Sequence, residues 1–346
     1  MNRILTKILL VLVAVLLIVS AVAYVKNNNT NSQGGTKKQN TSNLSEAPDK
    51  TGGLDKAEDV DPEPEGDSVS SNPELSPEDE EDGEINDNAE NTGESSKTDV
   101  REPLDRPIVL AFAGDVNLDD NAKTIARYDR ENKGILGGIS QELVDEMNNA
   151  DIFMLNNEFA FSTRGTRIEE KSYTFRAHPK RVEILKEMGT DIVSLANNHA
   201  LDYGVDALLD TFTTLEEAGI DYVGAGRNME RAKAPIYYTI GDTTIAFVAA
   251  SRVIYAMDWY ATDDRPGMIG TYDPELFVTS IKEAKENSDF VVAYVHWGVE
   301  RIHEPVKYQK ELAKIYIDAG ADAVIGCHPH VMQGIEFYKG KPIAYS

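Results

Sequence analysis

Cysteine is almost absent from this sequence of 346 residues, which contains Cys327 alone. A single cysteine excludes an internal disulfide, so the fold has to be stabilised by burial of apolar side chains. About 240 residues of mixed composition follow residue 106, enough chain for one sizeable core. No cysteine directly follows the apolar segment at the N-terminus. This absence excludes a lipid anchor of the lipoprotein type.

Basic residues are also scarce. The chain has 34 Lys and Arg against 59 Asp and Glu, which gives a formal net charge of −25. A nucleic-acid partner needs a basic face that displaces counterions from phosphates, so this class of partner is excluded. The acidic surplus is greatest in residues 26–106, which contain 22 acidic and 8 basic side chains.

Aromatic residues are missing from residues 26–106. This segment begins rich in Asn and Ser, has four prolines between residues 62 and 77, and contains the acidic run 78–82. A segment so charged cannot bury enough apolar surface to offset its ordering entropy, which predicts a disordered acidic linker. Repulsion between its carboxylates should keep it extended as a spacer. Calcium binding by the acidic run is the alternative, and the solvated linker is favoured over it.

Long apolar runs are absent except at the N-terminus. Residues 8–25 carry no charge and follow Arg3 and Lys7, which predicts a transmembrane helix whose N-terminus stays in the cytoplasm. The alternative is a cleaved signal peptide, because Ala21-Val22-Ala23 fits a cleavage pattern. Both interpretations export the rest of the chain. We therefore expect a single-pass protein of the cell membrane, with residues 1–25 as signal-anchor and an extracellular folded domain.

From residue 107 onward, buried strand patterns alternate with helical patterns. The predicted strands are residues 108–112, 151–155, 191–196, 220–223, 290–295 and 323–325. The predicted helices are residues 141–149, 179–188, 205–218, 274–287 and 306–319. This alternation predicts an α/β domain over residues 107–346, with one largely parallel sheet covered by helices on both faces. Two antiparallel hairpins are expected as well, formed by residues 236–240 with 244–250 and by residues 334–338 with 342–346.

A polar group follows each strong predicted strand. The groups are Gly114-Asp115-Val116-Asn117, Asn156-Asn157-Glu158, Asn197-Asn198-His199, His296-Trp297-Gly298 and Gly326-Cys327-His328-Pro329-His330, and they hold four of the six histidines. Each group alone has a structural explanation, such as helix capping by Asp115 or an Asx-turn at Asn198. Five groups together favour a shared site, because parallel strands bring their carboxyl ends to one edge.

The residue types in these groups point to a metal. Carboxylate, amide and imidazole groups suit Mn²⁺, Zn²⁺ or Fe, without the thiolates of a structural zinc site. A carboxylate that bridges two metal ions would make a clamp for displacement at phosphorus. In the stretch "SLANNHALDYG" (residues 194–204) we assign Asp202 and Tyr203 only to the turn before the helix near Gly204.

The motifs carry a family resemblance. In order, "GDVNL", "NNEFAFS", "SLANNHALDYG", "HWGVE" and "GCHPHVMQGIE" resemble the CapA family of poly-γ-glutamate capsule biosynthesis proteins, whose domain belongs to the calcineurin-like metallophosphatase superfamily. The similarity covers about residues 108–346 and not the linker. It implies a metallophosphatase-like layered α/β sandwich that holds one or two divalent metal ions.

The resemblance also implies roles at the amino-terminal motifs. Asp115 resembles the first aspartate ligand, and Glu158 takes the place of the aspartate that bridges the metals. Asn198 corresponds to the asparagine ligand of a Gly-Asn-His motif. His199 corresponds to the neighbouring catalytic histidine, which protonates the leaving group.

The carboxyl-terminal motifs match in the same way. His296 resembles the middle histidine ligand, and His328 with His330 resembles the closing Gly-His-x-His pair. Arg176, in "YTFRAHP", falls where the family tends to place an arginine, which implies binding of an anionic substrate; a surface ion pair is the alternative.

The sequence departs from the family pattern in three places. Asn117 stands where metallophosphatases usually have a histidine ligand, so the first metal site loses a strong ligand. The bridging group Glu158 is one methylene longer than aspartate. The sequence stops at "PIAYS", where family members usually continue into a Leu-Gly-Asn-Phe segment.

The leading hypothesis is an exported, membrane-tethered CapA-like protein that acts in the synthesis or export of an anionic surface polymer such as poly-γ-glutamate. Its metal site would hydrolyse a phosphate ester, or an amide or ester bond of the polymer, alongside other capsule-synthesis membrane proteins. One alternative is a non-catalytic, polymer-binding assembly component. Another is a generic cell-surface phosphodiesterase.

Overall fold

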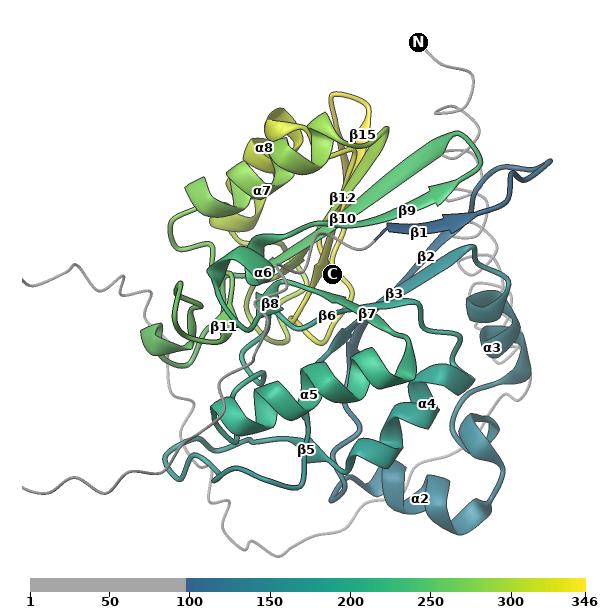
Figure 1. The fold of residues 1–346 in the computed structure, drawn as a ribbon, viewed down its shortest axis with the longest axis vertical. Helices are drawn as coiled ribbons and strands as arrows, with labels where there is room; N and C mark the ends of the chain where they lie inside the picture. The colour runs from purple at the N-terminus through teal and green to yellow at the C-terminus, as the bar shows by residue number, and fades with distance from the viewer. Residues whose placement is uncertain (1–97) are drawn as a thin grey trace, which may run out of the picture. The chain divides into compact units, whose positions relative to one another are not determined.

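The computed structural model describes residues 98–346, whose two large β-sheets pack face to face between two layers of helices (Figure 1). The four-stranded sheet has the order β2-β3-β6-β7 and is wholly parallel. Its strands are β2 (Leu110–Val116), β3 (Ile152–Asn157), β6 (Ile192–Ser194) and β7 (Asp221–Val223). A parallel sheet is buried on both faces, and all six residues of β3 are buried accordingly.

The seven-stranded sheet has the order β1-β9-β10-β12-β13-β15-β14. Its strands are β1 (Thr98–Arg101), β9 (Ile236–Ile240), β10 (Thr243–Ser251), β12 (Phe290–His296), β13 (Ala323–Cys327), β14 (Ile335–Tyr338) and β15 (Lys341–Ala344). The pairs β9 with β10 and β14 with β15 are antiparallel, and the other pairs are parallel. Both predicted hairpins are therefore confirmed. Lys339 and Gly340 have φ angles of 52° and 76°, the left-handed values that a two-residue hairpin turn requires.

The presence of two sheets differs from the single sheet expected from the sequence. Along β10, the side chains of Ile245, Phe247 and Ala249 belong to the core between the sheets. The alternate residues Ala246 and Val248 belong to the core beneath the helices. Because both faces of such a strand are apolar, its pattern reveals burial but not which strands share a sheet. The expectation of a largely parallel α/β arrangement with antiparallel hairpins holds.

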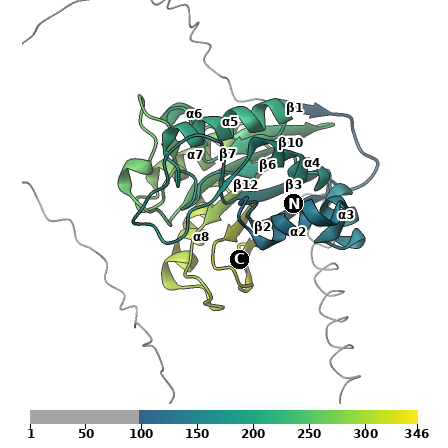
Figure 2. The ribbon, with the colours of Figure 1, turned by 90° about the horizontal axis from the view of Figure 1, so that it is seen from below.

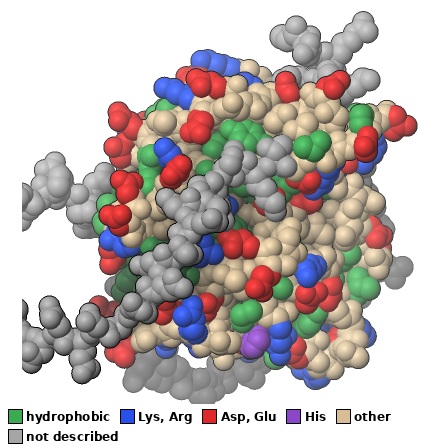
Figure 3. Space-filling view, in the orientation of Figure 1, with side chains coloured by type: hydrophobic (Ala, Val, Ile, Leu, Met, Phe, Trp, Pro, Cys, Tyr) green, Lys and Arg blue, Asp and Glu red, His purple; other side chains and the backbone are tan. Residues whose placement is uncertain are grey.

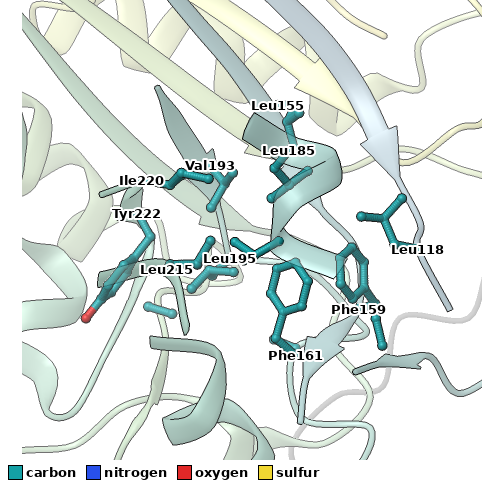
Figure 4. Packing of buried hydrophobic residues seen from close by; sticks show 14 of the residues in the cluster. Leu118, Leu155, Phe159, Phe161, Leu185, Val193, Leu195, Leu215, Ile220 and Tyr222 are labelled. Atoms are coloured by element: carbon teal, nitrogen blue, oxygen red, sulfur yellow. The ribbon is translucent and has the colours of Figure 1, made fainter. Parts of the chain in front are cut away.

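Helices cover the outer face of each sheet. On the four-stranded sheet lie α2 (Lys123–Glu131), α3 (Gln141–Asn148), α4 (Val182–Glu187) and α5 (Val205–Ala218), and on the seven-stranded sheet lie α7 (Glu275–Glu286) and α8 (Lys307–Ala319). The core beneath α4 and α5 contains Phe161, Leu185 and Leu215 (Figure 4). The second view places α3 and α8 on different sides of the domain, as the first does (Figure 2).

Most predicted helices are found with small shifts at their ends. The range 205–218 matches α5 directly, and Gly219 follows it with a φ of 74°, the conformation that ends many helices. The range 179–188 is divided into the 3-10 turn η2 (Pro179–Arg181) and α4. The helix α2 and several short elements were not predicted; the latter are η1 (Gly134–Gly137), α6 (Met229–Lys233), η3 (Met257–Trp259), β4 (Ala160–Phe161), β5 (Arg176–Ala177), β8 (Ala225–Gly226) and β11 (Gly267–Met268).

Strand β1 lies inside residues 26–106, the range for which composition predicts a disordered linker. It pairs in parallel with β9. The Arg101 side chain forms an ion pair of 2.8 Å with Asp191 and lies over the Tyr238 ring, 5.1 Å from its centroid. These tertiary contacts, invisible in composition, order the end of a polar segment.

The predicted membrane helix in residues 1–25, and the linker as far as residue 97, lie outside the described residues. Within residues 98–346, no helix is both long and apolar enough to cross a membrane. On the face drawn in Figure 3, Lys and Arg side chains are interspersed with Asp and Glu.

Candidate metal centre

The site lies where strands of both sheets reach their carboxyl ends. The register pairs Asp115 at the end of β2 with Asn156 of β3, and His296 of β12 with Cys327 of β13. The two sheets meet here, because the backbone N–H of His328 donates to Asp115 Oδ2 at 2.9 Å. Strand register and sheet packing therefore bring five distant sequence segments to one place.

The six predicted metal ligands converge, and we call Asp115, Glu158, Asn198, His296, His328 and His330 the ligand cluster. Potential ligand atoms of Asp115, His296 and Cys327 lie within 4.8 Å of one another. Those of Glu158, His328 and His330 form a second such group.

The two groups are not separate. Asp115 Oδ1 lies 3.5 Å from His296 Nδ1, and Asp115 Oδ2 lies 3.1 Å from His330 Nδ1. Glu158 Oε1 lies 3.7 Å from His296 Nε2. Each carboxylate therefore approaches a histidine of the other group, an arrangement that suits one ion or two adjacent ions.

Two buried atoms of the ligand cluster have no hydrogen-bond partner among the described residues: Glu158 Oε1 and His328 Nδ1. Leaving a buried polar atom unpaired costs about 1–3 kcal/mol, and more for a charged group. Burial and the nearby charge of Asp115 raise the pKa of Glu158 to about 9. Burial and neighbouring His296 lower the pKa of His328 to about 3. A carboxyl oxygen and a neutral imidazole nitrogen without partners offer lone pairs to a divalent cation, whose charge would favour the ionised form of Glu158. The residues therefore fit a metal.

The other ligands have partners. Although burial opposes it, the hydrogen bonds from His296 and His330 lower the pKa of Asp115 below its ordinary value. The hydrogen bond to Asp115 in turn raises the pKa of His330. Asp115 is therefore anionic at neutral pH, as a metal ligand has to be.

The backbone of the last motif is strained. His328 and His330 have φ angles of 98° and 54°, which side chains other than glycine rarely adopt and which cost about 1–3 kcal/mol each. Both residues follow the last strand residue, Cys327, and turn their rings toward Asp115 and His296: the His296 and His328 ring centroids are 4.6 Å apart. The positive φ angles thus place both rings beside other members of the ligand cluster.

Asn198 reaches the same point from the loop after β6. Its Oδ1 lies 3.0 Å from His296 Nε2. Two other amides support the loop: Asn197 Nδ2 donates to Asn156 Oδ1 at 3.1 Å, and Asn156 Nδ2 donates to Asp115 Oδ1 at 2.8 Å. The amides thus join the loop to two ligands.

His199 points into a second group of buried side chains, which we call the His199 network: Lys171, His199 and Asp202. His199 Nδ1 lies 2.6 Å from Asp202 Oδ2, and Lys171 Nζ donates to Asp202 Oδ1. Because the carboxylate accepts, Nδ1 carries the proton and Nε2 is left as the free ring nitrogen. Burial lowers the pKa of His199, although Asp202 opposes this shift.

This arrangement corrects the assignment of Asp202. The sequence analysis gives it only a turn-forming role, and it does accept from the backbone N–H of Phe175 at 2.8 Å. It also orients the imidazole of His199, three residues earlier. The spacing His-x-x-Asp was visible in the sequence, but the direction of the two side chains in an irregular loop was not.

Arg176 does not join the ligand cluster by any contact among the described residues. Its guanidinium donates to the Arg164 backbone carbonyl at 2.9 Å and lies 4.1 Å from the Tyr203 ring centroid. It forms no ion pair within residues 98–346, so the surface ion pair considered as an alternative is absent there. The Oδ1 of Asn117 accepts from the backbone N–H of Asp119 at 2.8 Å and so closes a local turn.

Sequence reasoning missed Lys171 and the contributions of Asn156 and Cys327. Cys327 Sγ lies 3.3 Å from His296 Nδ1, and burial together with Asp115 raises the pKa of the thiol. Asn156 stood in a recognised polar group, whereas Lys171 lies in a charged loop with no distinguishing pattern. A groove of about 460 Å³, lined in part by Asp115, His330 and Met332, gives solvent access to the ligand cluster.

Comparison with known proteins agrees with this geometry. The PGA biosynthesis protein CapA of Bacillus subtilis (strain 168) is 38% identical over 178 residues, covering 51% of this chain and 46% of that protein. The capsule biosynthesis protein CapA of Bacillus anthracis is 36% identical over 181 residues, covering 51% and 44%. A protein of Mycobacterium tuberculosis named a probable polyglutamine synthesis accessory protein is 32% identical over 204 residues, covering 56% and 54%. The chain thus spans about half the length of the curated relatives it matches.

A family model described as bacterial capsule synthesis protein PGA_cap matches residues 109–346. That range contains every member of the ligand cluster and of the His199 network. The chain therefore belongs to the PGA_cap family of bacterial capsule synthesis proteins, with the metallophosphatase-like fold.

Proposed function

We propose that this protein is a membrane-tethered, exported hydrolase that uses a metal centre in the synthesis or export of an anionic surface polymer such as poly-γ-glutamate. The observation that carries the catalytic part is the pair of unpartnered buried atoms, Glu158 Oε1 and His328 Nδ1, beside Asp115 and His296. The names of the relatives, which refer to capsule and PGA biosynthesis, support the polymer.

The ligand cluster would hold one or two divalent ions. When bound, such ions polarise a scissile phosphate, ester or amide group and make water nucleophilic at neutral pH. Asp115 and Glu158 supply negative charge, while His296, His328 and His330 supply neutral nitrogen ligands. The carboxylate and imidazole groups of the ligand cluster favour Mn²⁺, Zn²⁺ or Fe.

The remaining steps belong to the chain itself. Asp202 holds the proton of His199 on Nδ1, so that Nε2 can carry and deliver a second proton. We assign to this imidazole the protonation of the leaving oxygen or nitrogen. Arg176, which lacks an acidic partner among the described residues, is free to bind an anionic group of the substrate.

Turnover of an aryl phosphodiester by the purified full chain tests the catalytic proposal. We expect hydrolysis that depends on added Mn²⁺, that EDTA abolishes and that the His328→Ala variant lacks. The same assay with soluble poly-γ-glutamate, followed by chain-length analysis, separates a polymer hydrolase from a generic phosphodiesterase. Polymer binding without turnover of either substrate would indicate a non-catalytic binding component of the assembly. The presence of Asn117 in place of a histidine ligand favours that role.

The tether and its orientation rest on the sequence of residues 1–25. Two basic residues before the apolar run favour an N-terminus inside the cell, so the domain should face outward, near other capsule-synthesis membrane proteins. Protease added to intact cells should digest the domain while leaving a cytoplasmic control protein whole. A domain that resists until the cells are lysed would contradict the proposed location.

A further inference from the structure

Lys171 is a buried lysine beside the candidate metal centre. It lies in the connection between β4 and β5, and its side chain is 10% exposed. Its Nζ donates to Asp202 Oδ1 and to the backbone carbonyl of Asn198. The ammonium also lies over the Trp259 ring, 5.2 Å from the centroid. A lysine is rarely buried unless it is paired, and these contacts provide the pairing.

We propose that Lys171 is a positioning residue that couples the metal ligand Asn198 to the proton donor His199. Its ammonium holds the backbone carbonyl of Asn198 and the carboxylate of Asp202, which orients His199. The inference rests on the proposed function for its catalytic consequence, but its structural content stands on the contacts alone.

The link to His199 passes through the two oxygens of Asp202. This carboxylate has no exposed surface, and Lys171 is its only cationic partner within residues 98–346 apart from the His199 ring itself. Oδ2 accepts from His199 Nδ1 and from the Phe175 backbone N–H, at 2.6 and 2.8 Å. Because Lys171 occupies Oδ1, the carboxylate cannot rotate away from the ring without losing a buried charge-assisted hydrogen bond.

Lys171 also bears on the tautomer of His199. Its Nζ lies 3.2 Å from Nδ1, yet a nitrogen that already carries a proton cannot accept from an ammonium. The lysine hydrogens therefore go to Asp202 and Asn198, and the ring proton goes to Asp202. The ammonium thereby maintains the tautomer in which Nε2 is free.

The link to the metal passes through the peptide of Asn198. Lys171 fixes the carbonyl oxygen of this residue, while the Asn198 side-chain oxygen meets His296 Nε2 at 3.0 Å. Asn198 and His199 are adjacent, so a shift of the loop would move both together. Groups that orient metal ligands in this way typically matter by about 10- to 100-fold in affinity or activity.

Three variants test the proposal in the full-length chain. Lys171→Met removes the charge and keeps the length of the side chain, while Lys171→Arg retains the charge. Lys285→Met is a matched control, because Lys285 donates to buried Asp322 at 2.9 Å and Asp322 in turn accepts from the Val291 backbone N–H at 3.0 Å. That pair lies at the amino ends of β12 and β13, away from the site.

The measurements are thermal stability, Mn²⁺ affinity, the kcat and KM for an aryl phosphodiester, and the ¹⁵N spectrum of labelled histidine in metal-free protein. For Lys171→Met we expect a fall of about 10- to 100-fold in kcat with a smaller change in KM. We also expect weaker Mn²⁺ binding and loss of the spectrum typical of a ring protonated at Nδ1. Lys171→Arg should recover part of each loss, and Lys285→Met should change stability alone.

A folded Lys171→Met protein with the kcat and histidine spectrum of the wild type would overturn the inference. So would a Lys285→Met control with equal losses in kcat. Should Lys171→Met fail to fold, the folded Lys171→Arg variant decides, because loss of the Nδ1-protonated spectrum despite the retained charge would also contradict the proposal. A wild type that binds Mn²⁺ but hydrolyses neither substrate would refute the proposed hydrolase. The histidine spectrum and the Mn²⁺ affinity of the Lys171 variants would still test the positioning role of Lys171.

Discussion

The ligand cluster and the His199 network are neighbours, but their buried polar atoms are partnered differently. In the His199 network both oxygens of Asp202 accept hydrogen bonds, and a lysine balances the charge. In the ligand cluster Glu158 Oε1 and His328 Nδ1 lack partners among the described residues. One region is complete as the protein folds, whereas the other becomes complete only with a cation.

This difference assigns the two regions different tasks. A network whose members satisfy one another is rigid, which suits a group that has to deliver a proton along a fixed direction. A cluster with buried, unpaired ligand atoms can satisfy those atoms by binding an ion. Loss of the His199 side chain should therefore leave metal binding intact, whereas loss of a member of the ligand cluster should not. Loss of Lys171, which also holds the backbone carbonyl of Asn198, should weaken metal binding.

The largest effect is expected for His328→Ala. It removes a buried ligand whose nitrogen has no other partner, so metal stoichiometry and turnover should both be lost. Metal analysis of the purified protein measures the first, and the phosphodiester assay the second. His303→Ala is a matched control, because His303 is exposed and its hydrogen bond within residues 98–346 joins Nδ1 to the Met332 backbone carbonyl at 3.2 Å. Full metal content in His328→Ala would remove this residue from the ligand set.

His199→Ala should separate the two regions most clearly. Loss of a general acid typically reduces turnover by about 10²- to 10⁴-fold, while the ligands remain and metal content should stay at the wild-type level. Turnover and metal content should both be measured on the same purified protein. If metal is lost as fully as in His328→Ala, His199 belongs to the ligand cluster instead.

Asn198→Ala should have a smaller effect on the metal. Asn198 Oδ1 meets His296 Nε2, and removal of one weak amide ligand should lower Mn²⁺ affinity by about 10- to 100-fold without abolishing binding. Titration calorimetry would measure this change. Unchanged affinity would make Asn198 a support of His296 rather than a ligand.

The last prediction concerns the pH dependence of stability in metal-free protein and not turnover. The pKa of Glu158 is raised in the folded state to about 9 from an ordinary value of 4.5, so its contribution favours folding below pH 4.5. That contribution is lost as the pH rises from 4.5 to 9, because the unfolded carboxyl ionises first. Denaturant unfolding in EDTA should show this decline in the wild type and less of it in Glu158→Gln. Parallel pH profiles for the two proteins would show that Glu158 ionises normally.

Much of the fold could be predicted locally. Strands β3, β12 and β13 are short apolar runs, and the glycine after α5 ends that helix at the predicted residue. The short elements β4, β5, β8 and β11 could not be predicted, because two-residue strands have no periodicity and form only where a partner backbone is in place. The same reason explains β1, which is a strand because β9 offers an edge.

By itself, the sequence determined the types of the main elements and placed polar groups at the strand ends, because both depend on local pattern. The ligand roles of the six residues are predicted from the resemblance of these groups to a family. Only the tertiary structure decided that the strands form two sheets, that Lys171 and Asp202 orient His199, and that Arg176 lies apart from the ligand cluster. Contacts such as the one between Lys171 and Asp202, 31 residues apart, depend on how loops pack against each other. Loop packing is set by the whole core rather than by neighbouring residues, and no periodicity records it.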